Sequence, residues 1–434
     1  MTYRVTPPSE PERVVLVAVS GPVANDDGVK WSEQTLLEEL HALAISAGGE
    51  VVGQVVQRRQ APDKRFYIGR GKATELKDEV IASGAELVLF DNDLSPAQGK
   101  NLEDLVGVRV LDRSELILDI FADHARTNEA KLQVELAQLQ YLLPRLRRMW
   151  THLSRIRGGI GLRGPGETQL EVDRRVIRHR IGVLKGKLSH IEERRSLQRK
   201  SRRDAWNLAL VGYTNVGKST IMNRLSGERL KVEDKVFATL DATTRRIDLV
   251  GDEEILLTDT VGFIRNLPHH LVASFRATLE EVLHADLLLH VVDVSDSHYA
   301  DQMRVVRDVL TDLGADDAPM IHIFNKFDRV PAGERASLRA QVMAEYQDAV
   351  MASAIELRGL EALTDALTEF FKARRARVVV TLPLSDTRSL ARLHELGEVL
   401  ARRYTDSVVE VELETRPEVV ARIQQSGLSV EEVE

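Results

Sequence analysis

The chain has 434 residues, a formal net charge of −8, 43% hydrophobic and 29% charged residues, and no cysteine. This length predicts two to four domains, and the missing cysteine excludes disulfides and thiolate metal sites and fits a reducing cytosol. The overall acidity argues against a protein that coats nucleic acid generally, so any nucleic-acid contact must come from a local basic patch.

The apolar segments of the chain are short. No apolar run reaches the ~18–20 residues that a membrane helix needs. Charged residues precede the first short apolar run, which argues against a secretory signal. We therefore expect a cytoplasmic protein with no membrane partner.

Residues 1–124 alternate strand-like and helix-like runs. A helical pattern covers 31–47, and strand-like runs cover 13–19, 50–57, 86–90 and 108–112. This spacing predicts an N-terminal α/β subdomain with a parallel sheet. The basic loop within 58–76 contains Gly69, Arg70, Gly71 and Lys72. It is either an RNA-facing or plain surface loop or, with weaker support because the phosphate-loop spacing is missing, a second nucleotide site.

Residues 125–203 carry two helical stripes separated by a basic, glycine-rich stretch. The stripes consist of Leu132, Leu136, Leu139 and Leu143, then Ile177, Ile181, Leu184, Leu188 and Ile191. Steps of three and four residues predict two helices that bury these stripes against each other as an antiparallel hairpin. The stretch 141–166, at the hairpin's tip, has six arginines and no acidic residue.

Residues 204–373 return to α/β alternation and contain a phosphate-binding loop. NLALVGYTNVGKSTIMNRL (207–225) reads as strand, loop and helix, with Gly212, Gly217, Lys218 and Ser219 at the spacing of that motif. Glycines let backbone N–H groups close around phosphate oxygens at a helix N-terminus. We expect Lys218 to meet the β and γ phosphates and the Ser219 hydroxyl to bind Mg²⁺.

Two further apolar strands end in polar motifs. ILLTDTVGF (255–263) ends in Asp259, which can hold Mg²⁺ through water, and Gly262 follows, whose N–H can bind the γ-phosphate. IHIFNKFD (321–328) ends in Asn325, Lys326 and Asp328. The Asp328 carboxylate can accept two hydrogen bonds from guanine and rejects adenine, which lacks that donor pair.

Asn325 can bind the base edge and brace the phosphate loop, while the Lys326 stem lies along the ring. A backbone N–H at Ser353 and Ala354, after the next strand, could meet guanine O6. Three signals in this order, each at a strand end, define a guanine-nucleotide domain of the phosphate-loop GTPase type. VFATLDATTRR (236–246) is the predicted switch segment, with Thr239 as second Mg²⁺ ligand and Thr243 and Thr244 as rivals.

Residues 374–434, with strand-like runs at 378–384 and 407–413 around a helix-like run at 387–404, predict a small α+β domain.

Five segments together resemble the HflX family of translational GTPases. They are RGPGETQLEVDRR (163–175), GYTNVGKST (212–220), FATLD (237–241), DTVGF (259–263) and NKFD (325–328). The resemblance extends to about residue 373, and the C-terminal segment looks like an extra domain that some members carry. It implies binding of the large ribosomal subunit and GTP-linked separation of stalled or idle ribosomes into subunits. It further implies an N-terminal subdomain and hairpin that reach rRNA near the peptidyl-transferase centre.

The motifs and the resemblance together give a set of expected site residues. Lys218, Thr239 and Gly262 are expected to serve catalysis, and Ser219 and Thr239 to bind the metal. Nucleotide contacts are expected at Gly212, Tyr213, Thr214, Asn215, Val216, Gly217, Lys218, Ser219, Thr220, Phe237, Ala238, Thr239, Leu240, Asp241, Asp259, Thr260, Val261, Gly262, Asn325, Lys326, Asp328, Ser353, Ala354 and Ile355. RNA contacts are expected at Arg145, Arg147, Arg148, Arg155, Arg157 and Arg163, with Trp150 and His152 as stacking candidates. The alternative for the arginines is a solvated hairpin turn that confers solubility.

Phe263 occupies the position where many GTPases place the glutamine that orients the attacking water. We therefore predict slow intrinsic hydrolysis that ribosomes accelerate, with a monovalent cation such as K⁺ near Asn215 as a candidate helper. His269 and His270 are expected on the surface. A single arm that enters a ribosomal site favours a monomer. The alternatives are a large-subunit assembly checkpoint, a non-catalytic GTP-regulated RNA-binding protein and, least supported, an ATP-driven RNA remodeller.

Overall fold

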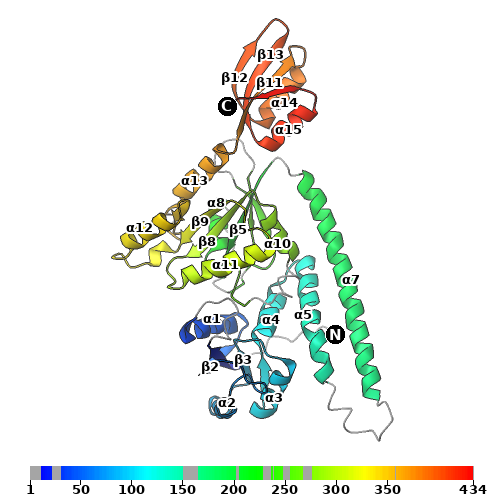
Figure 1. Cartoon of the computed structure of the whole chain (residues 1–434), viewed down its shortest axis with the longest axis vertical. Helices are drawn as coiled ribbons and strands as arrows, with labels where there is room; N and C mark the ends of the chain where they lie inside the picture. The colour runs from blue at the N-terminus through cyan, green and yellow to red at the C-terminus, as the bar shows by residue number, and fades with distance from the viewer. Residues whose placement is uncertain are drawn as a thin grey trace.

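The computed structural model describes residues 11–21, 31–149, 165–201, 205–227, 236–237, 239–247, 255–266, 276–356 and 358–433. Three sheets follow one another along the long axis of the molecule, with a long helical hairpin at one side (Figure 1). The predicted fold class, a multidomain α/β protein with a hairpin, is confirmed.

The N-terminal sheet is fully parallel, with the strand order β2-β1-β3-β4. Its strands are β1 (Arg13–Ser20), β2 (Glu50–Arg58), β3 (Leu87–Phe90) and β4 (Arg109–Leu111). Alternate residues of β1 face two different cores, so the sheet is buried on both faces, as parallel sheets require.

Four helices cover this sheet. They are α1 (Glu33–Ser46), α2 (Arg70–Ser83), α3 (Pro96–Val106) and α4 (Arg113–His124). Ser32 and Asp112 begin α1 and α4 by accepting backbone N–H bonds from Thr35 and Glu115. The predicted loop at 58–76 is partly wrong, because Gly69 is the N-cap of α2 and residues 70–72 are helical. Lys72 forms an ion pair with Glu75 one turn later.

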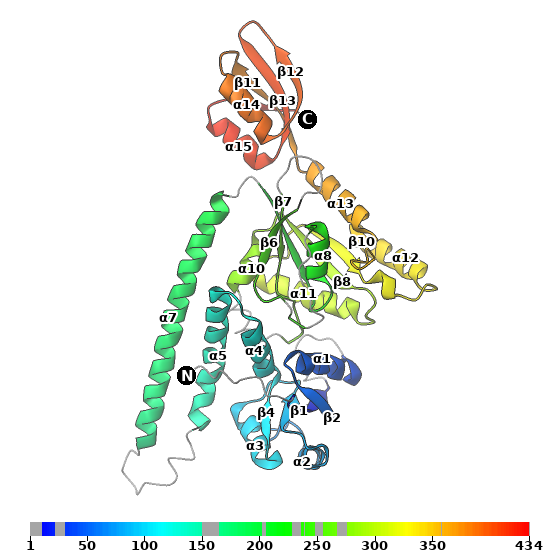
Figure 2. The ribbon, with the colours of Figure 1, turned by 180° about the vertical axis from the view of Figure 1, so that it is seen from behind.

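The predicted hairpin consists of α5 (Asn128–Met149) and α7 (Pro165–Ser201). Leu132 and Leu136 of α5 pack on Leu184 of α7, and Leu139, Ile181, Leu188 and Ile191 flank them. Two ion pairs tie the arms together, Arg180 with Glu135 at 2.7 Å and Arg195 with Glu129 at 2.8 Å. At 1.5 Å per residue α7 extends roughly 55 Å, past the central sheet toward the C-terminal part (Figure 2).

The central sheet has the order β10-β9-β8-β5-β7-β6, with all pairs parallel except β6 with β7. Its strands are β5 (Trp206–Gly212), β6 (Thr243–Ile247), β7 (Ile255–Asp259), β8 (Leu287–Asp293), β9 (Met320–Asn325) and β10 (Ala349–Met351). Its helices are α8 (Lys218–Leu225), α10 (Arg276–Leu283), α11 (Tyr299–Leu313), η1 (Phe327–Arg329), α12 (Arg335–Glu345) and α13 (Leu360–Lys372). Parallel strands end at one edge, so the sheet brings the three predicted motifs together there.

The C-terminal part is a four-stranded antiparallel sheet with the order β12-β13-β11-β14. Its elements are β11 (Ala376–Pro383), α14 (Thr387–Leu396), β12 (Glu398–Tyr404), β13 (Val408–Thr415), α15 (Pro417–Gln425) and β14 (Ser429–Glu432). This is a βαββαβ unit with its core between sheet and helices.

The predicted helix over 387–404 is wrong in its second half. The helix ends at Leu396, and residues 398–404 pair with β13 as strand β12. A Cβ on Gly397 would meet the carbonyl oxygen of Glu414 at 2.6 Å, so the glycine allows the chain to approach β13 closely. Backbone pairing with β13 outweighs the helical preference of Leu, Ala and Arg.

Among the described residues, no helix is both long enough and apolar enough to cross a membrane.

Candidate functional site

The phosphate loop connects β5 to α8 and depends on two glycines with positive φ. Gly212 has φ +149° and Gly217 φ +100°. A Cβ on Gly212 would meet the carbonyl oxygen of Val291 at 2.3 Å, and one on Gly217 would meet Asn325 Nδ2 at 2.4 Å. These two positions therefore need glycine both for conformation and for space.

Lys218 begins α8 with its side chain buried inside the loop. Its Nζ donates to the carbonyl oxygens of Gly212 at 3.1 Å and Tyr213 at 2.7 Å. Burial lowers the pKa of Lys218 to about 8, although the nearby Asp259 carboxylate opposes this shift. A Cβ on Gly262 would lie 3.0 Å from Nζ, so the first and second motifs converge on this ammonium group.

Three side-chain oxygens meet beside Lys218. The Ser219 hydroxyl donates to Asp259 Oδ2 at 2.6 Å, and the Thr239 hydroxyl lies 2.8 Å from Ser219 Oγ and 3.1 Å from Asp259 Oδ2. Burial raises the pKa of Asp259, while Lys218 and both hydroxyls oppose this shift. Among the described residues, buried Oδ1 of Asp259 has no hydrogen-bond partner. An unpaired carboxylate oxygen beside two hydroxyls fits a hard divalent cation such as Mg²⁺.

The rival threonines lie elsewhere. Thr243 and Thr244 belong to β6, and the Thr244 hydroxyl is paired with Thr258 at 2.9 Å. The geometry therefore brings Thr239, and neither rival, to Ser219.

The third motif braces the phosphate loop. Asn325 Nδ2 donates to the Val216 carbonyl at 2.8 Å. Lys326 Nζ donates to the Asn215 carbonyl at 2.7 Å and pairs with Asp293 at 2.7 Å. Asp328 lies in η1 just beyond, and its carboxylate contacts no donor among the described residues.

The loop after β10 differs from the prediction. The Ala354 N–H donates to Asn325 Oδ1 at 3.0 Å and the Ser353 N–H donates to the Arg358 carbonyl at 2.9 Å, so neither faces a base oxygen. The loop closes on itself because the Ser353 hydroxyl also accepts from Glu356 N–H at 3.1 Å. Ile355 follows with an exposed side chain.

Several expected nucleotide contacts have other partners, both in the predicted switch segment (236–246) and in the segment after β7 (259–266), which we call the second switch segment. Phe237 and Leu240 are buried in the core, with the Phe237 ring against Phe121. The Asp241 carboxylate accepts from the Thr127 backbone N–H, directly before α5, and the Thr260 hydroxyl donates to the Leu210 carbonyl at 2.6 Å. These side chains therefore hold the switch backbone in place rather than face the nucleotide site. Val216 and Val261 are likewise buried, Thr220 is half-buried in α8, and Ala238 lies outside the described residues, as do His269 and His270.

Phe263 is buried and pairs through its backbone with the phosphate loop. Its N–H donates to the Gly212 carbonyl at 3.0 Å, and its carbonyl accepts from Thr214 N–H at 2.8 Å. Phe263 thus joins the second motif to the loop without offering a polar group to a water molecule.

Sequence reasoning missed a buried ion cluster between the N-terminal subdomain and this site. Asp91, fully buried, accepts from Arg113 at 2.7 Å and from Arg265 at 2.7 and 2.8 Å. Glu39 contacts both arginines and the Tyr213 hydroxyl, and that hydroxyl accepts from the backbone N–H of Arg265 at 3.0 Å. One signal was present, since Asp91 directly follows the apolar strand β3.

The predicted RNA contacts divide into two groups. Arg145 is wrong as a contact at the hairpin tip, because its guanidinium pairs with buried Asp112 at 2.7 Å, donates to the Leu94 carbonyl at 2.9 Å and lies over the Tyr141 ring. It anchors α5 to the N-terminal subdomain. The side chains of Arg147, Arg148, Arg155, Arg157 and Arg163 lie outside the described residues, as do Trp150 and His152.

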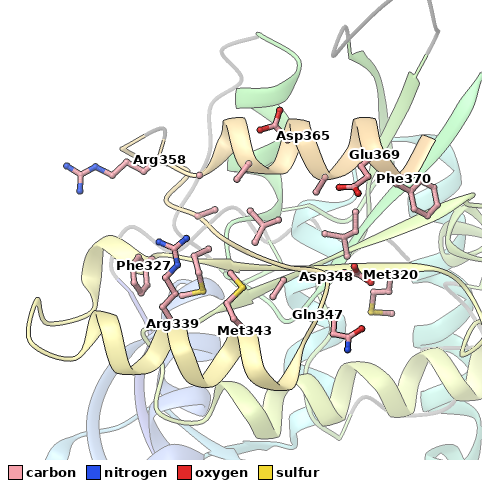
Figure 3. A pocket seen from close by; sticks show the side chains of 18 of the residues that line it. Met320, Phe327, Arg339, Met343, Gln347, Asp348, Arg358, Asp365, Glu369 and Phe370 are labelled. Carbon is pink, nitrogen blue, oxygen red and sulfur yellow. The ribbon is translucent and has the colours of Figure 1, made fainter. Parts of the chain in front are cut away.

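A separate pocket of about 970 Å³ lies along the edge strand β10 between α12 and α13 (Figure 3). Arg339 and Met343 line it on one side and Glu369 and Phe370 on the other. It reaches Asp328 but none of the phosphate-loop residues, so it is not the phosphate cradle.

Three family models match the chain in succession. They are described as GTP-binding GTPase N-terminal, over residues 34–122, GTP-binding GTPase Middle Region, over 124–202, and 50S ribosome-binding GTPase, over 207–326. Among solved structures, a GTP-binding protein from Sulfolobus solfataricus in complex with GDP is 25% identical with a TM-score of 0.43, covering 82% of this chain and 98% of that one.

Curated relatives match over most of their length. GTPase HflX of Caldanaerobacter subterraneus subsp. tengcongensis is 45% identical over 419 residues, which is 95% of this chain and 93% of the relative. GTPase HflX of Escherichia coli K12 is 45% identical over 386 residues, covering 88% and 90%. With the three models in order and identity at this level across nearly the whole length, the chain belongs to the HflX family of GTPases.

Proposed function

We propose that this GTPase binds the large ribosomal subunit and, in its GTP state, splits stalled or idle ribosomes into subunits, with hydrolysis resetting it. The observation that carries the proposal is the meeting of Ser219, Thr239 and Asp259 beside Lys218, which gives the chain a site that can distinguish GTP from GDP. The match to a family model described as 50S ribosome-binding GTPase supports the partner. Such a protein would work in the cytoplasm, as a monomer whose single arm enters the ribosome.

The residues of the site have distinct proposed roles. Lys218 neutralises the β and γ phosphates, and the Gly262 N–H donates to the γ-phosphate. Ser219 and Thr239 would hold Mg²⁺ through their hydroxyls and Asp259 through water, and bound Mg²⁺ would neutralise charge on the phosphate oxygens. The buried setting of Lys218 and Asp259 strengthens each of these interactions relative to water.

Base selection is assigned to Asp328 and Asn325. The Asp328 carboxylate would accept two hydrogen bonds from guanine, and it contacts no donor among the described residues. Asn325 acts by fixing the phosphate loop relative to the loop after β10, because its side-chain amide bonds Val216 in the first and Ala354 in the second.

A group other than Phe263 must orient the attacking water, because the Phe263 side chain is apolar and buried. Hydrolysis is therefore slow until the ribosome orders the switch segments. Asn215 is exposed, has φ +60° and could contribute an amide oxygen to a K⁺ ion. Turnover in K⁺ against Na⁺, for the wild type and Asn215→Ala, tests that role.

The remaining proposed RNA contacts are Arg147 and Arg148, in the last turn of α5, and Arg155, Arg157 and Arg163, which follow α5. The stretch 141–166 that contains them has no acidic residue. Arginines at the end of a long arm can neutralise rRNA phosphates, and the glycines between them allow close approach to RNA. The second candidate function is a checkpoint in large-subunit assembly, which needs the same arm and switch but acts on immature particles.

Sucrose gradients test the proposal. Whole ribosomes are mixed with protein and GTP, GDP or a non-hydrolysable GTP analogue, beside a variant with Arg155, Arg157 and Arg163 changed to Ala. We expect conversion to subunits in the GTP state, protein retained on the large subunit, and failure of the variant. Binding to immature particles without splitting whole ribosomes would favour the assembly role, and no binding in any nucleotide state would refute both.

A further inference from the structure

The Thr239 segment, defined here as residues 236, 237 and 239–241, is attached to the N-terminal subdomain just before Thr239. The Val236 N–H donates to the Ser46 hydroxyl, at the end of α1, at 3.1 Å. The Phe237 ring packs edge-on against Phe121 of α4, with ring centres 4.6 Å apart and both side chains buried.

The same segment is attached to the hairpin just after Thr239. Asp241 accepts from the backbone N–H groups of Arg126 and Thr127, each at 3.1 Å, and from the Thr127 hydroxyl. These N–H groups belong to the two residues directly before α5, beside the end of the helix that favours negative charge. Asp241 therefore links the segment to the first residues of the hairpin's first arm.

The backbone at Phe237 indicates that these contacts determine the conformation. Its φ of +56° lies in the left-handed region, which a bulky aromatic residue adopts only where its surroundings enforce it. Packing on Phe121 is the contact that can enforce it. Thr239 lies two residues from both Phe237 and Asp241 and is the residue of the segment that reaches Ser219 and Asp259.

We propose that Phe237 and Asp241 are positioning residues, through which the N-terminal subdomain and the first hairpin arm hold Thr239 against Ser219 and Asp259. The proposal rests on the GTPase function assigned above and adds a route between nucleotide and hairpin. A ligand that needs Thr239 favours the attached arrangement, and by linkage the attached arrangement favours that ligand. GDP lacks the γ-phosphate, so its affinity is independent of the attachment.

Asp241→Ala tests the proposal by removing the link to α5 while leaving Thr239, Ser219 and Asp259 in the chain. We expect kcat for GTP and the affinity for a non-hydrolysable GTP analogue to fall roughly tenfold, within the usual range of coupling between sites. The affinity for GDP stays at the wild-type value. Asp241→Asn keeps an acceptor oxygen and should retain more activity than Asp241→Ala.

His298→Ala is the matched control, because it removes another contact between the GTPase domain and the part of the chain that precedes it. His298 lies 2.9 Å from the Thr35 hydroxyl and against the Trp31 ring, and among the described residues it makes no hydrogen bond to the Thr239 segment. We expect wild-type kcat from it. Three outcomes would each overturn the proposal. Asp241→Ala could lose affinity for the GTP analogue and for GDP equally, or it could keep the wild-type kcat. His298→Ala could lose as much kcat as Asp241→Ala.

These readouts separate the proposal from the ribosomal function. All of them use nucleotide and protein alone. If the wild-type protein does not bind ribosomes, ribosome splitting is contradicted. If Asp241→Ala still loses affinity for the GTP analogue and not for GDP, the positioning role remains supported.

Discussion

Lys218 is an ammonium group in a buried setting, and that setting makes nucleotide binding pH-dependent. Burial lowers its pKa to about 8, whereas contact with phosphate favours the charged form. Free protein must therefore take up protons when it binds nucleotide at pH 8, roughly half a proton per site if the group is half-ionised there. Affinity should fall as the pH rises above 8.

Calorimetry of GDP binding at pH 8, in two buffers of different ionisation enthalpy, measures this uptake. At pH 6.5 the uptake should vanish, because Lys218 is already charged in the free protein. Identical heats in the two buffers at pH 8 would show that the Lys218 pKa is not lowered.

Asp91 makes the second residue-scale prediction. Burial alone would raise its pKa, but Arg265 and Arg113 hold the pKa below its ordinary value of 3.8. The carboxylate therefore contributes stability above that pH, which is lost as the pH falls further. Asp91→Ala leaves two buried arginines short of a partner and should cost about 3–5 kcal/mol.

The measurement is the unfolding midpoint of the full chain in urea at pH 7. Asp93→Ala is the control, since Asp93 lies in the same loop with an exposed side chain that bonds Ser114 at 2.6 Å. A midpoint for Asp91→Ala as high as that for Asp93→Ala would mean that the cluster adds no stability.

At the scale of elements, the hairpin depends on a narrow apolar seam. Leu184 is fully buried between Leu132 and Leu136, so Leu184→Ala should cost about 2–5 kcal/mol of local stability. Leu197→Ala, on the same helix but 66% exposed, should cost little. Hydrogen exchange of α7 amides measures both, and equal protection in the two variants would contradict this packing.

The elements also show what the sequence can predict. β5, β7 and β9 are apolar runs that end in motifs. The sequence therefore predicts that they are strands and that their carboxyl ends meet at one edge of a sheet. The leucine stripes gave the hairpin for a similar reason, since helical spacing is a local property. β12 could not be read, because its partner β13 overrides a helical composition.

Contacts between residues far apart in the chain could not be predicted from the sequence either. Arg265 and Asp91 are 174 residues apart, and no local pattern pairs them. The same holds for Phe237, whose motif suggested a nucleotide contact but whose ring packs on Phe121. Motifs predict which backbone forms the site, whereas tertiary packing decides which of their side chains face it.

At the scale of the whole molecule, both switch segments contact parts of the chain that precede the GTPase domain. In the first segment, Phe237 contacts Phe121 of α4 and Asp241 contacts Thr127, directly before α5. In the second, Arg265 contacts Asp91, directly after β3. The hairpin continues from α5 along the side of the molecule (Figure 1). A partner that binds the arm is therefore in a position to alter the switch segments, which Phe263 leaves without a water-orienting glutamine.

The most direct test is multiple-turnover GTP hydrolysis with and without saturating large ribosomal subunits. We predict slow turnover alone and a rise of roughly tenfold or more with large subunits, as when a partner completes a GTPase site. Small subunits should have no effect. Turnover that is unchanged by large subunits, in protein shown to bind GTP, would contradict the claim that this is a ribosome-dependent GTPase.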